Sequence, residues 1–240
     1  MKEFINKIRS YLQRRKSKKH TDYEFIHWLK FVNPGMLDNG NLYCFEYAVN
    51  NLPTGDPIVE IGSFCGLSTN LISFYLQKSG KQNKLITCDK WIFEGAENPD
   101  DYLKGSLIQH KDYKGFVRDT YIRNVTFFSK GSLPYTIEVF SDEFFERWEN
   151  NEKALDIFNR PVQLGGKISF AYIDGNHSYE FAKRDFENTD RHLVKGGFIL
   201  FDDSADFTDW EVKKVIDIVK KKGDYEVVAK NPNYLFRKIQ

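Results

Sequence analysis

The sequence predicts an α/β fold in which a mostly parallel sheet is covered by helices on both faces. From Pro57 onward, short apolar runs bounded by turn residues alternate with stretches of helical periodicity. Strands that alternate with helices form crossover units, and their parallel sheet is buried on both faces. The chain closes with two apolar runs around Asn231-Pro232-Asn233, which predict a terminal antiparallel hairpin.

These patterns assign an element to most of the chain. Residues 22–50 are expected to be helical, with breaks at Asn33-Pro34-Gly35 and Asn39-Gly40. We divide the chain into an amino-terminal helical extension, residues 1–50, and a main domain, residues 51–240. The expected elements of the main domain are strands at Ile58–Ile61, Lys84–Cys88, Val125–Phe128, Ile168–Ile173 and Phe198–Phe201, helices at Leu67–Gln77 and Phe181–Leu193, and hairpin strands at Tyr225–Ala229 and Tyr234–Arg237.

Length and composition are those of a globular protein. The 240 residues are 41% hydrophobic, enough for a substantial core. No apolar run approaches the ~20 residues of a membrane-spanning helix, and the sequence does not begin with a secretory signal. Three cysteines form no metal-type spacing, and their odd number argues against a disulfide framework. We therefore expect a cytoplasmic protein.

Charge is distributed unevenly along the chain. Residues 1–20 carry eight Lys or Arg against Glu3, a net charge of +7, so the remainder carries about −6 of the total of +1. The main domain therefore has no nucleic-acid footprint. The basic segment is either a helix on an anionic membrane surface, such as the inner membrane, or a solvated or docked terminus. Its apolar residues recur at helical spacing: Phe4, Ile5, Ile8, Tyr11 and Leu12.

A glycine turn follows the first predicted strand. Gly62 and Gly66 let the backbone turn sharply and approach a ligand without a Cβ in the way. Such a ligand lies at the carboxyl end of the strand, where open α/β sheets place their sites. The spacing is neither the dinucleotide G-x-G-x-x-G pattern nor a phosphate loop, which favours a ligand without a pyrophosphate. Glu60 ends this strand and Asp89 follows the next, where a carboxylate either accepts hydrogen bonds from ribose hydroxyls or caps a turn.

Carboxylates also follow the last two strands before the hairpin. Asp174 follows one strand, and Asp202 and Asp203 follow its neighbour. Adjacent parallel strands bring these groups to one sheet edge, where three carboxylates repel unless a cation neutralises them. Oxygen ligands suit Mg²⁺, with Mn²⁺ or Ca²⁺ as alternatives. His177, three residues after Asp174, is the candidate general base. Each residue alone is equally compatible with capping a helix or turn.

The pattern E-x-G-x-x-x-G-x-S, Asp89 and the segment Asp174-Gly175-Asn176-His177-Ser178-Tyr179 resemble the class I S-adenosylmethionine (SAM) dependent methyltransferases. The likeness spans roughly residues 54–238 and is greatest to the branch of macrocin-type and aminocoumarin-sugar O-methyltransferases, which has cephalosporin hydroxylase-like relatives. It implies a Rossmann-like, seven-stranded sheet, and it places Lys130-Gly131-Ser132 beside the adenine. The residues that it assigns to SAM binding are Glu60, Gly62, Ser63, Gly66, Ser68, Asp89, Gly131, Ser132 and Asp174.

The resemblance also implies the chemistry. A divalent metal held by Asp174, Asp202 and Asp203 would bind the hydroxyl of a small acceptor, a sugar or another natural product, and His177 and Asp174 would be the catalytic residues. The alternatives are a metal-independent N- or C-methyltransferase and a noncatalytic interaction protein. Hydroxylation lacks support because the sequence shows no triad of two histidines and one carboxylate. Homo-oligomerisation stays open.

Two predicted connections are unusually long. Trp91–Tyr121 follows Asp89 and is rich in charged and aromatic residues, and Leu133–Lys167 carries Phe144, Phe145 and Trp148 at helical spacing. Their aromatic residues are expected either to line a ligand site or to bury small cores of their own.

Overall fold

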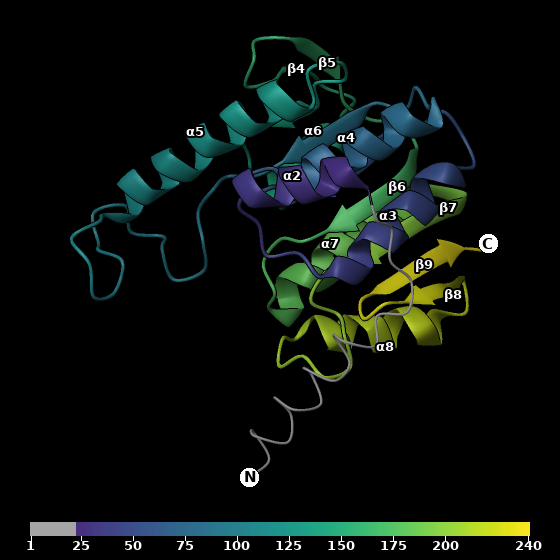
Figure 1. Cartoon of the computed structure of the whole chain (residues 1–240). Helices are drawn as coiled ribbons and strands as arrows, with labels where there is room; N and C mark the ends of the chain where they lie inside the picture. The colour runs from purple at the N-terminus through teal and green to yellow at the C-terminus, as the bar shows by residue number, and fades with distance from the viewer. Residues whose placement is uncertain (1–22) are drawn as a thin grey trace.

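The structure is a computed structural model that describes residues 23–240, so the predicted amphipathic segment within residues 1–20 lies outside the described residues. Helices and strands alternate along the described chain (Figure 1). In order, they are α2 (Glu24–Val32), α3 (Asn39–Asn50), β1 (Ile58–Ile61), α4 (Leu67–Ser79), β2 (Leu85–Cys88), α5 (His110–Phe128), β3 (Tyr135–Ile137), α6 (Ser141–Glu149), β4 (Lys153–Leu155), β5 (Pro161–Gln163), β6 (Ile168–Ile173), α7 (Tyr179–His192), β7 (Leu193–Phe201), α8 (Val212–Lys222), β8 (Tyr225–Lys230) and β9 (Tyr234–Lys238).

Seven of the strands form one sheet in the order β3-β2-β1-β6-β7-β9-β8. The pairs from β3 to β7 are parallel, whereas β9 runs antiparallel to both β7 and β8. The terminal hairpin therefore places its second strand inside the sheet, between β7 and β8. This arrangement confirms the predicted fold class, including the mostly parallel sheet and the carboxyl-terminal hairpin.

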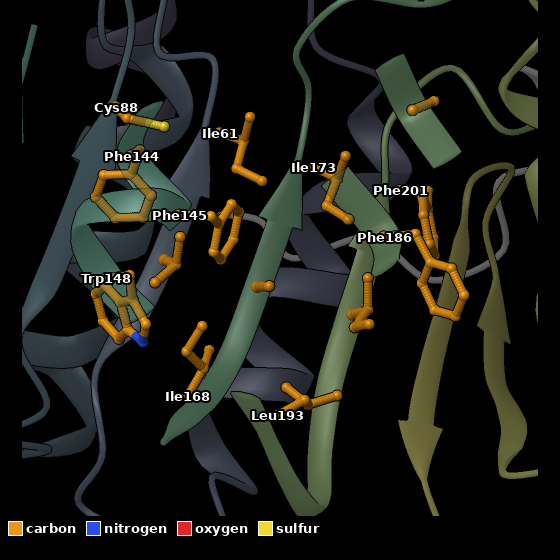
Figure 2. Close-up of a cluster of buried hydrophobic side chains, with 14 of the residues drawn as sticks. Ile61, Cys88, Phe144, Phe145, Trp148, Ile168, Ile173, Phe186, Leu193 and Phe201 are labelled. Carbon is orange, nitrogen blue, oxygen red and sulfur yellow. The ribbon is translucent and has the colours of Figure 1, made fainter. Parts of the chain in front are cut away.

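Alternate residues of each central strand face opposite layers of helices. Val59 and Ile61 of β1 pack with α6, α7 and α8, while Ile58 packs with α2, α3 and α4. Figure 2 shows the first of these cores, in which Phe144, Phe145 and Trp148 of α6 lie against the sheet. Because both faces are covered, the central strands are buried throughout, which explains their nearly continuous apolar sequences.

The strand predicted at Val125–Phe128 is wrong, because these residues form the last turn of α5. Val117, Tyr121 and Val125 are the buried residues of α5, and their spacing of four places them on one helix face. A short apolar run such as Val125–Phe128 has no periodicity that separates a strand from the end of a helix. The third strand of the sheet is instead Tyr135–Ile137, inside the segment expected to be a long connection.

The aromatic residues of the two long connections are divided between structural cores and solvent. Trp91 is buried with Cys65 and Tyr121 in a third cluster beneath α5, and the aromatic residues of α6 belong to the main core. Tyr102 and Phe116 remain exposed. The expectation of a small core of its own is therefore confirmed for Trp91, whereas the aromatic residues of α6 join the main core. Among residues 23–240, no helix has the length and apolar character needed to cross a membrane.

Helix α3 is fixed against the turn of the terminal hairpin. A Cβ added at Gly40 would lie 1.4 Å from the carbonyl oxygen of Asn231. The amide of Asn231 also donates a hydrogen bond to the carbonyl of Gly40, at 3.2 Å. This close approach joins two segments that are 191 residues apart in the sequence.

We predict that Gly40→Ala destabilises the fold by about 2 kcal/mol or more, because the added methyl group forces the hairpin turn away from α3. Gly55→Ala is the matched control, since a Cβ at Gly55 meets nothing within 4 Å. Urea unfolding followed by circular dichroism measures both free energies of unfolding. Equal stability of Gly40→Ala and Gly55→Ala would show that this contact does not constrain the fold.

Candidate active site

The glycine turn after β1 lies against the end of β6. Gly62 has a φ of +83°, and a Cβ there would lie 2.0 Å from the carbonyl oxygen of Asp174. Gly66 has a φ of +87°, and its Cβ would lie 3.1 Å from the Tyr121 ring of α5. Both glycines are therefore required by conformation and by space. The carboxyl ends of β1 and β6 consequently meet at one point of the sheet edge.

Asp89 holds the glycine turn by its backbone. One carboxylate oxygen accepts hydrogen bonds from the N–H groups of Ser63 and Phe64, at 2.8 and 2.9 Å. The other accepts the N–H of Trp91, at 2.6 Å. Phe64 and Trp91 both have positive φ angles, 44° and 52°, so these bonds stabilise conformations that are otherwise costly. The predicted turn-capping role of Asp89 is present in the structure, and its role toward a ribose stays a prediction.

Polar residues form a row through the sheet just below this edge. Thr136, Thr87, Glu60 and Tyr172 pair in register across β3, β2, β1 and β6, one residue before each strand ends. We call these four residues the polar row. Sequence analysis identified only Glu60 among them. The available signal was a single polar or phenolic residue next to the last position of each apolar run.

Glu60 is the fully buried carboxyl group of the polar row. Its Oε2 accepts hydrogen bonds from the hydroxyls of Thr69, at 2.5 Å, and Ser63, at 3.3 Å. Its Oε1 is buried and has no hydrogen-bond partner. Burial raises the pKa of Glu60 to about 8, although hydrogen bonds from Ser68 and Thr69 oppose this shift. Glu60 is therefore largely protonated at neutral pH.

A chain of side-chain amides supports the glycine turn from behind. The carbonyl of Cys65 accepts hydrogen bonds from Asn33, at 2.9 Å, and from Asn124 of α5, at 2.8 Å. Asn70 of α4 donates to Asn33 and accepts a hydrogen bond from the hydroxyl of Ser129. Sequence analysis read Asn33 only as part of a chain break. Isolated asparagines carry no sequence signal for such a network.

Asp174, His177 and Asp203 converge at the ends of β6 and β7. His177 Nε2 lies 3.0 Å from an oxygen of Asp203 and 3.9 Å from an oxygen of Asp174. One ligand atom from each residue lies within 4.8 Å of the others, a spacing that suits a shared metal ion. Burial alone would lower the pKa of His177, but the two carboxylates outweigh it and raise that pKa to about 10. The group of Asp174, His177 and Asp203 therefore holds one proton, on His177. This positive charge balances the carboxylates where a cation would otherwise be needed.

Asp202 lies behind this group rather than in it. It is buried, and one of its oxygens accepts hydrogen bonds from the amides of Asn41, at 2.8 Å, and Asn233. The other accepts the Tyr172 hydroxyl at 2.8 Å, and the same hydroxyl lies 3.0 Å from Asp174. The structure thus brings His177 together with Asp174 and Asp203, while Asp202 is hydrogen-bonded to side chains, and the ligand set of Asp174, Asp202 and Asp203 stays a prediction. Burial, together with the charges of Asp174 and Asp203, raises the pKa of Asp202.

A family model described as a methyltransferase domain matches residues 59–204, which run from the glycine turn through Asp203. The chain belongs to this methyltransferase family. The match covers more than half of the chain. Its range includes both the glycine turn and the group of Asp174, His177 and Asp203.

Several individual proteins are similar over nearly the whole methyltransferase. An uncharacterized protein, R132, of Acanthamoeba polyphaga mimivirus is 23% identical over 218 residues, covering 90% of this chain and 82% of that protein. The O-methyltransferase TomG of Streptomyces achromogenes, solved in complex with SAM, has a TM-score of 0.56 at 11% identity and covers 99% of this chain and 98% of its own. CalS11, a TDP-rhamnose 3′-O-methyltransferase of calicheamicin biosynthesis, has a TM-score of 0.51 at 15% identity, with 98% and 94% coverage. These structures share the class I methyltransferase fold.

The segment predicted to lie beside the adenine, Gly131-Ser132, lies near the carboxyl end of α4. Gly131 and Ser132 follow α5, and a Cβ at Gly131 would lie 3.7 Å from Gln77 near the end of α4. That position is at the opposite end of α4 from the glycine turn. The displacement follows from the wrong strand at Val125–Phe128. Residues after the true third strand begin instead with Glu138, which pairs with Arg118 at 2.7 Å.

A hollow of about 550 Å³ lies between the loop after β2 and the start of α5. Glu94 lines this hollow and accepts a hydrogen bond from the backbone N–H of His177 at 2.8 Å, so the hollow borders the Asp174 group. The Trp210 ring lies 4.7 Å from the His177 ring. The other residues of the hollow that bear rings or charge are Phe93, Asp101, Tyr102, Lys104, His110 and Tyr113.

We predict that Glu60 makes the fold less stable as the pH rises. Its folded pKa of about 8 exceeds the ordinary value of 4.5, so the folded state binds more protons between these values and loses stability through this window. Glu60→Gln removes this loss. The melting temperature of Glu60→Gln minus that of the native protein should therefore increase from about pH 5 to about pH 9. The increase corresponds to a few kcal/mol of unfolding free energy, at ~1.4 kcal/mol per pKa unit.

The control for this measurement is Glu187→Gln, which changes an exposed carboxyl group of α7. Its melting temperature should follow that of the native protein across the same range. A constant difference between Glu60→Gln and the native protein would contradict the buried, protonated state of Glu60.

Proposed function

We propose that this methyltransferase transfers the methyl group of SAM to a hydroxyl of a small acceptor and that a divalent cation assists the reaction. The observation that carries the proposal is the convergence of Asp174, His177 and Asp203 beside the glycine turn. In the overall reaction, the sulfur–methyl bond of SAM breaks, an oxygen–methyl bond forms, and the hydroxyl loses its proton. Sugars and other natural-product hydroxyls are the proposed acceptor class, supported by the fold shared with CalS11.

The residues around the glycine turn fit the amino-acid end of SAM. The turn leaves no room for a Cβ at Gly62, and Glu60 beneath it has an oxygen without a partner. Ser63 lies on the turn, Ser68 lies in the first turn of α4, and Asp89 fixes the backbone of the glycine turn. Asp89 Oδ1, which accepts one hydrogen bond, keeps lone-pair capacity for a ribose hydroxyl, whereas Oδ2 already accepts two. We assign the adenine contact to residues that follow β3, beginning at Glu138, in place of Gly131 and Ser132.

The donor set of Asp174, Asp203 and His177 fits a divalent cation, with two carboxylate oxygens and one imidazole nitrogen. A cation bound there supplies positive charge that lowers the pKa of an acceptor hydroxyl. The carboxylates then no longer require a protonated His177, which becomes free to take up a proton or to bind the cation. Tyr172 and Asp202 position Asp174 from behind through the shared hydroxyl. The hollow beside Glu94 is the proposed place for the acceptor.

A metal-independent reaction is the second candidate. The 3.0 Å ion pair between His177 and Asp203 already neutralises part of the acidic group without a metal. An enzyme of this type would use His177 and Asp174 to orient an acceptor nitrogen or carbon. Its activity would survive chelation of divalent cations, which separates the two candidates.

We predict that the purified protein binds SAM and that Asp89→Ala weakens this binding at least tenfold, because the glycine turn loses two backbone anchors and the loop at Trp91 loses one. Isothermal titration calorimetry gives the affinities. Asp100→Ala, at an exposed carboxylate of the following loop, should bind as the native protein does. Gly131→Ala should also bind normally, whereas a loss there would restore Gly131 to the cofactor site. Absence of SAM binding by the native protein would refute the proposed activity.

We predict that Mn²⁺ binds to the Asp174 group with release of about one proton, because the cation replaces the proton held by His177. Titration with a pH indicator measures this release, and electron paramagnetic resonance measures the bound metal. Asp203→Asn should weaken Mn²⁺ binding at least tenfold. Asp206→Asn, an exposed change in the loop that follows β7, should leave it intact. Methyl transfer to a panel of hydroxyl acceptors that persists fully in EDTA would favour the metal-independent candidate.

A further inference from the structure

We propose that the outer face of α2 docks on an anionic lipid membrane together with the basic segment that precedes it. This inference does not depend on the acceptor or on the metal. It rests on a group of exposed apolar side chains and on the distribution of charge along the sequence.

The outer face of α2 is apolar although it is exposed. Trp28, Phe31 and Val32 are 63%, 78% and 61% exposed. Their spacing places them on one face of the helix, and the rings of Trp28 and Phe31 lie 6.0 Å apart. Met36, which is 85% exposed, lies in the loop four residues after the end of α2. We call Trp28, Phe31 and Val32 the α2 face.

The opposite side of α2 explains why this face points outward. Ile26 and Leu29 are buried in the core shared with α4, and Phe25 stacks on Phe74 at 4.6 Å between ring centres. Figure 1 shows α2 lying across the outside of the helical layer. The helix is therefore fixed in the fold by its inner side. Its outer apolar residues add nothing to that packing, and large exposed apolar patches commonly mark contact sites.

The sequence that precedes α2 is strongly positive. Residues 1–20, which end just before α2, carry a net charge of +7, whereas residues 21–240 carry −6. Stable attachment to a membrane usually requires two signals, and an apolar face beside a polybasic segment supplies both. Basic segments of this kind are attracted to the negative surface of membranes that contain anionic lipids.

Other partners satisfy only one of these two features. A second copy docked through the α2 face would bring two segments of +7 charge together, and these repel one another. A double-stranded nucleic acid would attract the basic segment through its phosphates, but its bases stack on one another inside the duplex and offer no apolar surface to Trp28, Phe31 and Val32. An anionic bilayer accommodates both, with the apolar side chains at the headgroup boundary and the lysines and arginines at the charged surface.

The test uses the full chain with vesicles of phosphatidylcholine alone or of phosphatidylcholine with phosphatidylserine. We expect sedimentation with the anionic vesicles, little with the neutral ones, and loss at high salt. Trp28→Ala combined with Phe31→Ala should reduce the bound fraction at least tenfold. Leu107→Ala combined with Leu155→Ala, which removes exposed apolar groups elsewhere, should leave it unchanged.

A second pair of variants tests the charge. Lys18→Glu with Lys19→Glu should lower binding, whereas Lys195→Glu with Lys221→Glu makes the same charge change on the main domain and should not. Tryptophan emission should also shift to shorter wavelength on anionic vesicles, and Trp28→Phe should abolish this shift. That signal separates insertion of α2 from simple adsorption of the basic segment.

Three results would overturn the proposal. The first is absence of binding to anionic vesicles, and the second is binding that does not change in the Trp28→Ala and Phe31→Ala variant. The third is a Trp28 that acrylamide cannot quench in the absence of vesicles, which would show that the protein covers the face itself. If light scattering then shows a dimer that Phe31→Ala dissociates, a second copy of the chain covers the α2 face. If it shows a monomer, residues of the same chain cover that face.

Discussion

The backbone of Gly62 and the carbonyl of Asp174 approach so closely that a Cβ at Gly62 would lie 2.0 Å from the oxygen. This contact sets the distance between the glycine turn after β1 and the acidic group after β6. Asp89 maintains it from the other side, because its carboxylate binds two backbone N–H groups of the turn. The proposed cofactor and metal positions both depend on this arrangement, since each is built on one of the two loops.

Several residues at this edge hold conformations that need support from their surroundings. Phe64, Trp91 and Asp203 have positive φ angles, and all three lie on loops that follow strands of the sheet. Trp91 is held by its buried ring and by a hydrogen bond from its indole to the carbonyl of Phe64, at 2.9 Å. Strained residues of this kind concentrate at functional sites because the rest of the fold determines their conformation.

The same edge concentrates buried carboxyl groups, which oppose folding when they are charged. Glu60 avoids this cost because it keeps its proton, as its pKa of about 8 indicates. Asp202 is stabilised by the hydrogen bonds that it accepts from Asn41, Asn233 and Tyr172. These partners come from α3, the terminal hairpin and β6, so a buried carboxylate connects three distant parts of the chain. The stability of the fold and the position of Asp174 are consequently coupled through Tyr172.

The sequence by itself determined the fold class and most of the residues at the sheet edge. Alternation of apolar runs with helical stretches identified the central strands, because a sheet buried on both faces requires continuous apolar residues. Asp174 and Asp203 were predictable as neighbours because the carboxyl ends of parallel strands meet at one edge. Gly62 and Gly66 were predictable because a sharp turn requires their positive φ angles.

Only the tertiary structure decided how these residues are paired. Val125–Phe128 joined α5 because Val125 packs with Tyr121 in the cluster beneath that helix, a contact that the short apolar run by itself does not reveal. Asp202 and Asp203 are adjacent in sequence, yet one is buried among amides and the other faces His177. Consecutive residues differ in this way because the backbone turns at Asp203, with a φ of 48°. The partners of Asp202 are 161 and 31 residues away in sequence, at Asn41 and Asn233, so only the folded chain brings them together.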